Sequence, residues 1–132
     1  MKHLLFTLFL WSTAMAAFAQ DSAEQLAQAQ LEGYNTRNIE AFLAPYSEDV
    51  AVYSFPQKLQ YRGKAEMRKV YTGMFNDLPD LHCTLVSRMV QGDVVIDQES
   101  VVFRSGEPPL KAIAIYKIRN GKIAEVYFIS EQ

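Results

Sequence analysis

The feature that most constrains how this chain can fold is the alternation of apolar and polar side chains from Leu81 to its end. A period of two is typical of β-strands with one buried face. Three groups of turn residues interrupt it: Gly-Asp at 92–93, Ser-Gly-Glu-Pro-Pro at 105–109 and Asn-Gly at 120–121. Short turns of this kind join neighbouring antiparallel strands. The sequence therefore predicts a C-terminal meander of four strands.

The chain before this meander shows helical periodicity in three places. Asp21 or Ser22 can cap a helix that runs to about Thr36, Asn38 can cap a short second helix, and a third is expected from about residue 64 to 77. Between them, the β-branched and aromatic residues at 50–55 indicate a buried strand. The expected buried stripes are Leu26, Ala29, Gln30, Gly33 and Tyr34 in the first helix and Met67, Val70, Tyr71, Met74 and Phe75 in the third.

Helices followed by a run of strands predict an α+β fold. We expect a cone-shaped, curved antiparallel sheet wrapped around the three N-terminal helical segments. A chain of 132 residues has the usual size of one domain. The domain is expected to span residues 20–132.

Residues 1–19 have the composition of a signal peptide. Met1 to His3 form a short positive start, residues 4–11 are apolar except for Thr7, and Ala-Phe-Ala at 17–19 is typical of a cleavage site. The alternative is a membrane anchor, but the apolar run is well short of the roughly 20 residues that span a bilayer. We therefore expect cleavage before Gln20, a periplasmic or secreted protein, and no stable membrane insertion afterwards.

Composition argues against several classes of function. The net charge is −2 and the basic residues are scattered, whereas nucleic-acid binding usually requires a dense lysine and arginine cluster. The single cysteine, Cys83, rules out an intramolecular disulfide and a cysteine-based zinc site. A site of histidine and carboxylates would lack a third, suitably spaced histidine. We expect no nucleic-acid partner, no metal and no cofactor.

The last hairpin can close in two ways. A two-residue loop at 120–121 would place Lys117 and Glu125 on opposite faces, whereas a three-residue loop at 119–121 places them on the same face. We favour the second register because it segregates the charges, and a slip of one residue moves every side chain across the sheet. Its concave face carries Ala112, Ala114, Tyr116, Ile118, Ala124, Val126 and Phe128. Its outer face carries Ile113, Ile115, Tyr127 and Ile129, which indicates a homodimer interface unless helices cover it.

The first hairpin of the meander groups polar residues on one face. With Gly-Asp at 92–93 as a two-residue loop, Arg88 lies opposite Asp97, and His82 and Glu99 share that face. Acidic groups among apolar neighbours need partners, because an isolated buried charge costs several kcal/mol. One interpretation is an ion pair between Arg88 and Asp97, with His82 and Glu99 as pocket or supporting groups. The other is a general base formed by His82 with Asp97 or Glu99.

Several short strings resemble one superfamily in their order and spacing. They are NIEAF at 38–42, VYSFP at 52–56, RGK at 62–64 before Tyr71, PDLH at 79–82, VIDQE at 95–99, AIAIY at 112–116 and NGKI at 120–123. Together they resemble the nuclear transport factor 2-like superfamily, especially its SnoaL-like and ketosteroid-isomerase-like bacterial branch. The resemblance covers essentially all of the chain after residue 19. It implies a cone-shaped α+β fold, an apolar pocket between helices and sheet, and dimerisation through the outer face of the sheet.

The resemblance does not by itself assign a reaction, because one fold hosts many functions. Ketosteroid isomerases use a tyrosine, a protonated aspartate and a second aspartate, and the resemblance puts Gln30, Ala114 and Ser54 at these positions. Ser54 is no base at neutral pH and Ala114 cannot donate a hydrogen bond, so that chemistry is not expected. Tyr46 and Tyr71 match two supporting tyrosines and are expected to be pocket polar groups or core residues.

Three hypotheses for function follow. The favoured one is a periplasmic binding or accessory protein that holds a small apolar or amphipathic ligand. The second is a small-molecule isomerase, lyase or hydrolase that uses His82 with Asp97 or Glu99. The third is a dimeric scaffold whose pocket is filled by its own side chains. The expected pocket comprises Gln30, Tyr34, Tyr46, Ser54, Tyr71, Phe75, Ala114, Tyr116 and Phe128.

Overall fold

The computed structural model describes residues 20–131, and the predicted signal peptide at 1–19 lies outside them. The first half contains α1 (Ala23–Asn35), α2 (Ile39–Leu43), β1 (Tyr46–Ser54), β2 (Lys58–Arg62) and α3 (Lys64–Asp77). The second half contains β3 (His82–Gln91), β4 (Val94–Val102), β5 (Leu110–Arg119) and β6 (Lys122–Ser130). The three predicted helices and the four-strand meander are confirmed.

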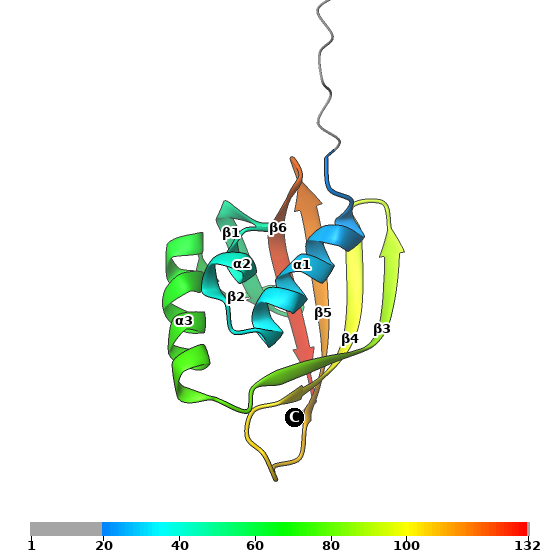
Figure 1. Ribbon diagram of the computed structural model, residues 1–132. Helices are drawn as coiled ribbons and strands as arrows, with labels where there is room; N and C mark the ends of the chain where they lie inside the picture. Colours follow the sequence, from blue (N-terminus) through cyan, green and yellow to red (C-terminus); the bar gives the residue numbers. More distant parts are fainter. Residues whose placement is uncertain (1–19, 132) are drawn as a thin grey trace, which may run out of the picture.

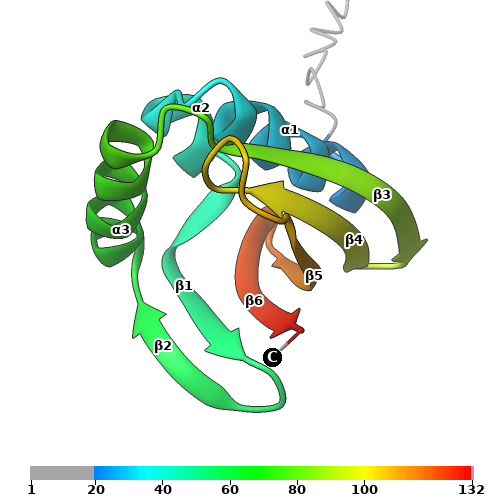
Figure 2. The same ribbon diagram turned by 90° about the horizontal axis from the view of Figure 1, so that it is seen from below.

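All six strands form one curved sheet in the order β2-β1-β6-β5-β4-β3. Strands β1 and β6 are parallel, and every other neighbouring pair is antiparallel. The helices lie against one face of the sheet, and the sheet curves around them (Figures 1 and 2). In Figure 2, β3 and β4 curve past α1, and β2 runs back to α3. The expected α+β architecture is confirmed.

Helix α1 begins where its capping residues predict. The Ser22 hydroxyl accepts a hydrogen bond from the Gln25 backbone at 3.2 Å, and the Gln25 side chain accepts one from the Ser22 backbone at 2.8 Å. The buried stripe is shifted from the predicted one, since Ala29 is exposed and Ala27 is buried instead. Gly33 faces α2, where a Cβ would overlap the backbone of the second helix. Only glycine allows the two helices to approach so closely.

The elements around α3 differ most from the prediction. Strand β2 is not expected from the sequence, because it is a short edge strand whose mostly exposed residues do not alternate. Helix α3 packs against α2, β1 and β2 and not across the centre of the sheet. It therefore buries only Met67 and Phe75, while Val70, predicted to be buried, is 42% exposed.

The last hairpin combines the two predicted alternatives. Its loop has two residues, because Arg119 pairs with Lys122. Asn120 and Gly121 both have positive φ, as a tight hairpin of this type requires. The predicted three-residue loop is thus wrong, but an irregular step in the pairing beyond Lys117 restores the predicted faces. Lys117 lies directly opposite Glu125, and their charged groups are 2.8 Å apart.

The first hairpin of the meander also contains an irregular step. Arg88 pairs with Asp97 as predicted. Beyond this point the register shifts, so that Leu85 and not Val86 lies opposite Glu99. The additional residue, Val86, is largely exposed. As a result, the alternation of faces reverses along the first part of β3.

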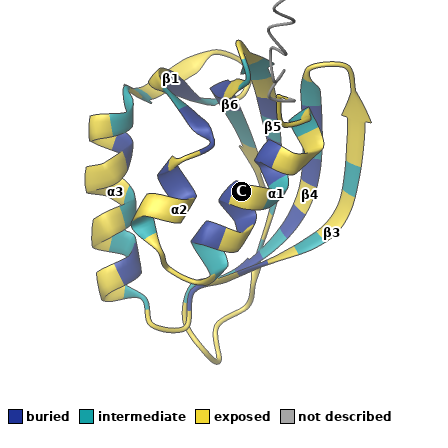
Figure 3. Ribbon diagram, turned by 45° about the horizontal axis from the view of Figure 1, so that its top comes forward, coloured by how far each residue is buried: buried dark blue, intermediate teal, exposed yellow. Residues whose placement is uncertain are grey.

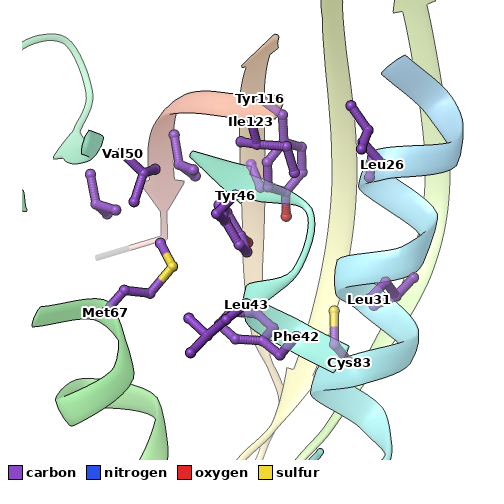
Figure 4. Packing of buried hydrophobic residues seen from close by; sticks show 14 of the residues in the cluster. Leu26, Leu31, Phe42, Leu43, Tyr46, Val50, Met67, Cys83, Tyr116 and Ile123 are labelled. Atoms are coloured by element: carbon purple, nitrogen blue, oxygen red, sulfur yellow. The ribbon is translucent and has the colours of Figure 1, made fainter. Parts of the chain in front are cut away.

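The core lies between the helices and the concave face of the sheet (Figure 3). Figure 4 shows Tyr46, Tyr116 and Cys83 among its buried side chains, together with residues from α1, α2 and α3. Ala114 and Tyr116 of β5 are buried there, so the neighbouring Ile113 and Ile115 point to the outer face. The alternative that helices cover the outer face is wrong. Among residues 20–131, no helix is long and apolar enough to cross a membrane.

Candidate functional site

A cavity of about 240 Å³ lies between the helices and the concave face of the sheet. Its wall is mostly apolar and receives side chains from all three helices and from five of the strands. Six of the predicted pocket residues line it: Gln30, Tyr34, Tyr46, Tyr71, Tyr116 and Phe128. The hollow on the Ala112 and Tyr116 side of β5, which the choice of faces predicts, is therefore present.

Three predicted pocket residues do not line the cavity. Ser54 lies at the end of β1, beside Phe128 in the sheet. Phe75 packs behind the wall against the rings of Tyr34 and Tyr71. Ala114 is completely buried in the core and leaves no surface for a ligand.

A chain of hydrogen bonds runs along the polar part of the wall. The Tyr46 hydroxyl donates to Gln30 Oε1 at 3.2 Å, and Gln30 Nε2 donates to the Tyr116 hydroxyl at 3.0 Å. The Tyr116 hydroxyl in turn donates to Glu99 Oε1 at 3.3 Å. Every donor points toward Glu99, and bonds aligned in this way polarise one another. The carboxylate is the acceptor at which the chain ends.

Glu99 lines the cavity and is only 7% exposed. Burial and the nearby charge of Asp97 raise its pKa to about 7, although the Tyr116 hydrogen bond and the Cys83 thiol act in the opposite direction. A carboxyl group with this pKa changes its charge near neutral pH. Glu99 can therefore exchange a proton with a molecule in the cavity or hold a positive charge there.

The other buried acid, Asp97, has a cationic partner within the protein. Arg88 Nε and one of its terminal nitrogens contact the two Asp97 oxygens at 2.7 and 2.8 Å. Arg88 also donates to Gln28 of α1 at 3.0 Å. The predicted cross-strand ion pair is confirmed, and Asp97 does not line the cavity. This bidentate pair ties β3 and β4 to α1.

The predicted grouping of His82 with the two acids is wrong. His82 is exposed, pairs with Val102 and points to the outer face, because the irregular step at Val86 reverses the alternation along β3. Cys83 takes the inward place and lines the cavity. The general base of His82 with Asp97 or Glu99 therefore does not form.

Cys83 is one of several cavity residues that the sequence prediction missed. The Asn35 side chain holds it in place, since it accepts from the Cys83 backbone N–H and donates to its carbonyl, both at 2.8 Å. Burial and the nearby acids raise the pKa of the thiol well above its usual range, so it stays neutral. A signal for its inward position exists in the alternation of Leu81, Cys83 and Leu85, which is out of phase with Arg88.

The described residues offer no ready site for a metal. Between residues 20 and 131, no three histidine, cysteine or acidic side chains come together in a way that could hold an ion. The chemistry that this arrangement can perform is acid–base chemistry or charge pairing at Glu99.

The α+β fold is the one shared by cystatin-fold and nuclear transport factor 2-like proteins of known structure. Within this class, the SnoaL-like domain matches residues 27–126, and the chain belongs to the SnoaL-like domain family. No protein among those with curated functions matches the chain.

Solved structures of similar proteins share the fold at low sequence identity. An uncharacterised cystatin-fold protein from Novosphingobium aromaticivorans is 22% identical with a TM-score of 0.75, covering 83% of this chain and 98% of that one. A candidate ketosteroid isomerase from Kribbella flavida is 20% identical with a TM-score of 0.70, covering 86% and 82%. A candidate polyketide cyclase from Sinorhizobium meliloti is 13% identical with a TM-score of 0.68, covering 80% and 94%. These likenesses show the fold.

Proposed function

We propose that the protein binds a small, mostly apolar molecule in the cavity. The observation that carries the proposal is an aromatic-walled cavity of about 240 Å³ with one buried carboxylate, Glu99, at its wall. Binding sites for small molecules are usually apolar concavities with a few fixed polar groups. An engineered cavity of about 150 Å³ in another protein binds benzene, so this cavity has room for one ring with a short chain.

Calorimetric titration with 2-phenylethanol tests the binding function. We expect saturable binding to the mature chain, and Ala112→Phe should abolish it because Ala112 lines the cavity. Ala65→Phe is the matched control, since Ala65 lies on α3 away from the cavity wall and its enlargement leaves the cavity unchanged. Equal affinity in both variants would contradict binding at this site.

We further propose that this binding protein acts outside the cytoplasm. The support is the positive, apolar and Ala-Phe-Ala segments of residues 1–19. Intact mass spectrometry of the exported protein should give the mass of a chain that begins at Gln20. Recovery of a chain that still carries Lys2 would contradict cleavage.

A second candidate function is proton transfer with Glu99 as the base. It is favoured by the pKa of about 7, since a base is most effective when its pKa is near the working pH. The candidate isomerase and cyclase of the same fold make this a relevant reaction class. Incubation with a cyclic ketone in D2O should then give deuterium at the carbon beside the carbonyl. Glu99→Gln should abolish the exchange, and His82→Ala should not; persistence in Glu99→Gln would refute this role.

A further inference from the structure

We propose that the ligand is a small apolar amine, held as its ammonium ion between the Glu99 carboxylate and the aromatic wall of the cavity. The inference rests on the proposed binding function and names the chemical class that the site selects. It arises from an imbalance of charge inside the protein.

The two buried acids of β4 differ in how their charges are compensated. Asp97 has a bidentate ion pair with Arg88, whose remaining contact is to Gln28. Glu99 has no ion pair with a lysine, arginine or histidine anywhere in residues 20–131. A buried carboxylate without a cation is costly, and a cation in the cavity would offset that cost. The ligand can supply the charge that the chain omits.

The hydrogen-bond chain favours the same ligand chemistry. Tyr46, Gln30 and Tyr116 donate in sequence toward Glu99 Oε1. An ionised carboxylate only accepts hydrogen bonds, so a ligand must approach it with a donor. An ammonium group offers three donors and a full positive charge, whereas an alcohol offers one donor and no charge.

The rest of the wall suits an organic cation. The Tyr34 and Tyr71 rings, both at the cavity, meet edge to face at 6.1 Å, and the Phe42 and Tyr71 rings lie 4.3 Å apart. Aromatic faces within about 6 Å attract a cation, most strongly away from water. An ammonium ion at Glu99 would gain the charge of the carboxylate, and its apolar part would pack against these rings on the same cavity wall.

Binding should depend on pH through Glu99. The groups that face it are Asp97 on its own strand, Cys83 on β3 and Tyr116 on β5, with Arg88 further away beside Asp97. Tyr34, Tyr46 and Tyr71 face it from α1, β1 and α3, and burial keeps their hydroxyls neutral by raising the pKa of each. With a pKa of about 7 for Glu99 and about 10 for an alkylamine, both partners are charged at pH 8. At pH 5 only about 1% of Glu99 is ionised.

The experiment uses three probes of nearly equal size: 2-phenylethylamine, 2-phenylethanol and phenylacetate. In calorimetry at pH 8, the amine should bind at least tenfold more tightly than the alcohol, and phenylacetate should not bind. At pH 5 the amine should bind more weakly than at pH 8, by up to about 90-fold and no further than the affinity of the alcohol, while the alcohol is unaffected. In Glu99→Gln the affinity for the amine should fall to the affinity for the alcohol. Glu107→Gln is the charge-matched control, because Glu107 is an exposed loop residue.

The outcomes separate this inference from the function on which it rests. If the alcohol binds as tightly as the amine at pH 8, or if Glu99→Gln keeps the preference for the amine, the amine inference is overturned while binding in the cavity stands. If none of the probes binds to the folded protein, both are overturned. The pH comparison on the unmodified protein distinguishes these outcomes even if the substitution impairs folding.

Discussion

The wild-type protein should lose stability as the pH rises through 7, and the Glu99→Gln variant should lack this loss. Glutamine keeps the size of the side chain and can still accept the hydrogen bond from Tyr116, but it has no charge at any pH. In the folded protein, burial and the Asp97 charge raise the pKa of Glu99 from 4.5 to about 7. The folded state therefore binds the proton more tightly than the unfolded state does.

The magnitude follows from this difference in pKa. The stabilisation from the bound proton is fully present below pH 4.5 and is lost as the pH rises through 7. A difference of one pKa unit corresponds to about 1.4 kcal/mol. The free energy of unfolding of the wild-type protein should therefore fall by about 3 kcal/mol relative to that of the variant over this range. This is a large part of the roughly 5–15 kcal/mol that is typical of a domain.

Urea unfolding followed by circular dichroism at pH 4.5, 6 and 8 measures the effect. The free energy of unfolding of Glu99→Gln minus that of the wild type should increase across the series, because other titrating groups cancel in the difference. Glu107→Gln, which changes an exposed carboxylate, should show no such trend. A difference between Glu99→Gln and the wild type that is the same at pH 4.5 and pH 8 would refute the buried, proton-binding state of Glu99.

Three further predictions concern the scaffold. Arg88→Met should cost about 3–5 kcal/mol in urea unfolding, because it leaves a buried carboxylate without its partner; Lys117→Met, in an exposed pair, should cost less than about 1 kcal/mol. Gly33→Ala should cost about 1–3 kcal/mol because the new methyl overlaps the backbone of α2, whereas Gly73→Ala, with open space around it, should stabilise α3 by up to about 1 kcal/mol in the same assay. Ile115→Asp, on the outer face of the sheet, should convert the expected dimer to a monomer in sedimentation velocity; an unchanged sedimentation coefficient would contradict dimerisation through that face.

The sequence by itself determined the three helices and every strand of the sheet except β2. Turn residues at 92–93, 105–109 and 120–121 set where the meander reverses, since these turn chemistries are local. The alternation along β5 and β6 fixed which side faces the helices, and with it the cavity wall at Tyr116 and Phe128. The pairing of Arg88 with Asp97 also followed, because both lie close to a two-residue loop.

Only the tertiary structure decided which residue of β3 faces the cavity. Because of the irregular step at Val86, Cys83 and not His82 faces the cavity. Nothing local in the sequence requires the step to occur at that residue. Likewise, the hydrogen-bond chain from Tyr46 through Gln30 and Tyr116 to Glu99 joins α1 to strands β1, β5 and β4, which are far apart in sequence. Alternation assigns faces only while the register stays regular, whereas burial and the pKa of Glu99 depend on how all the surrounding elements pack.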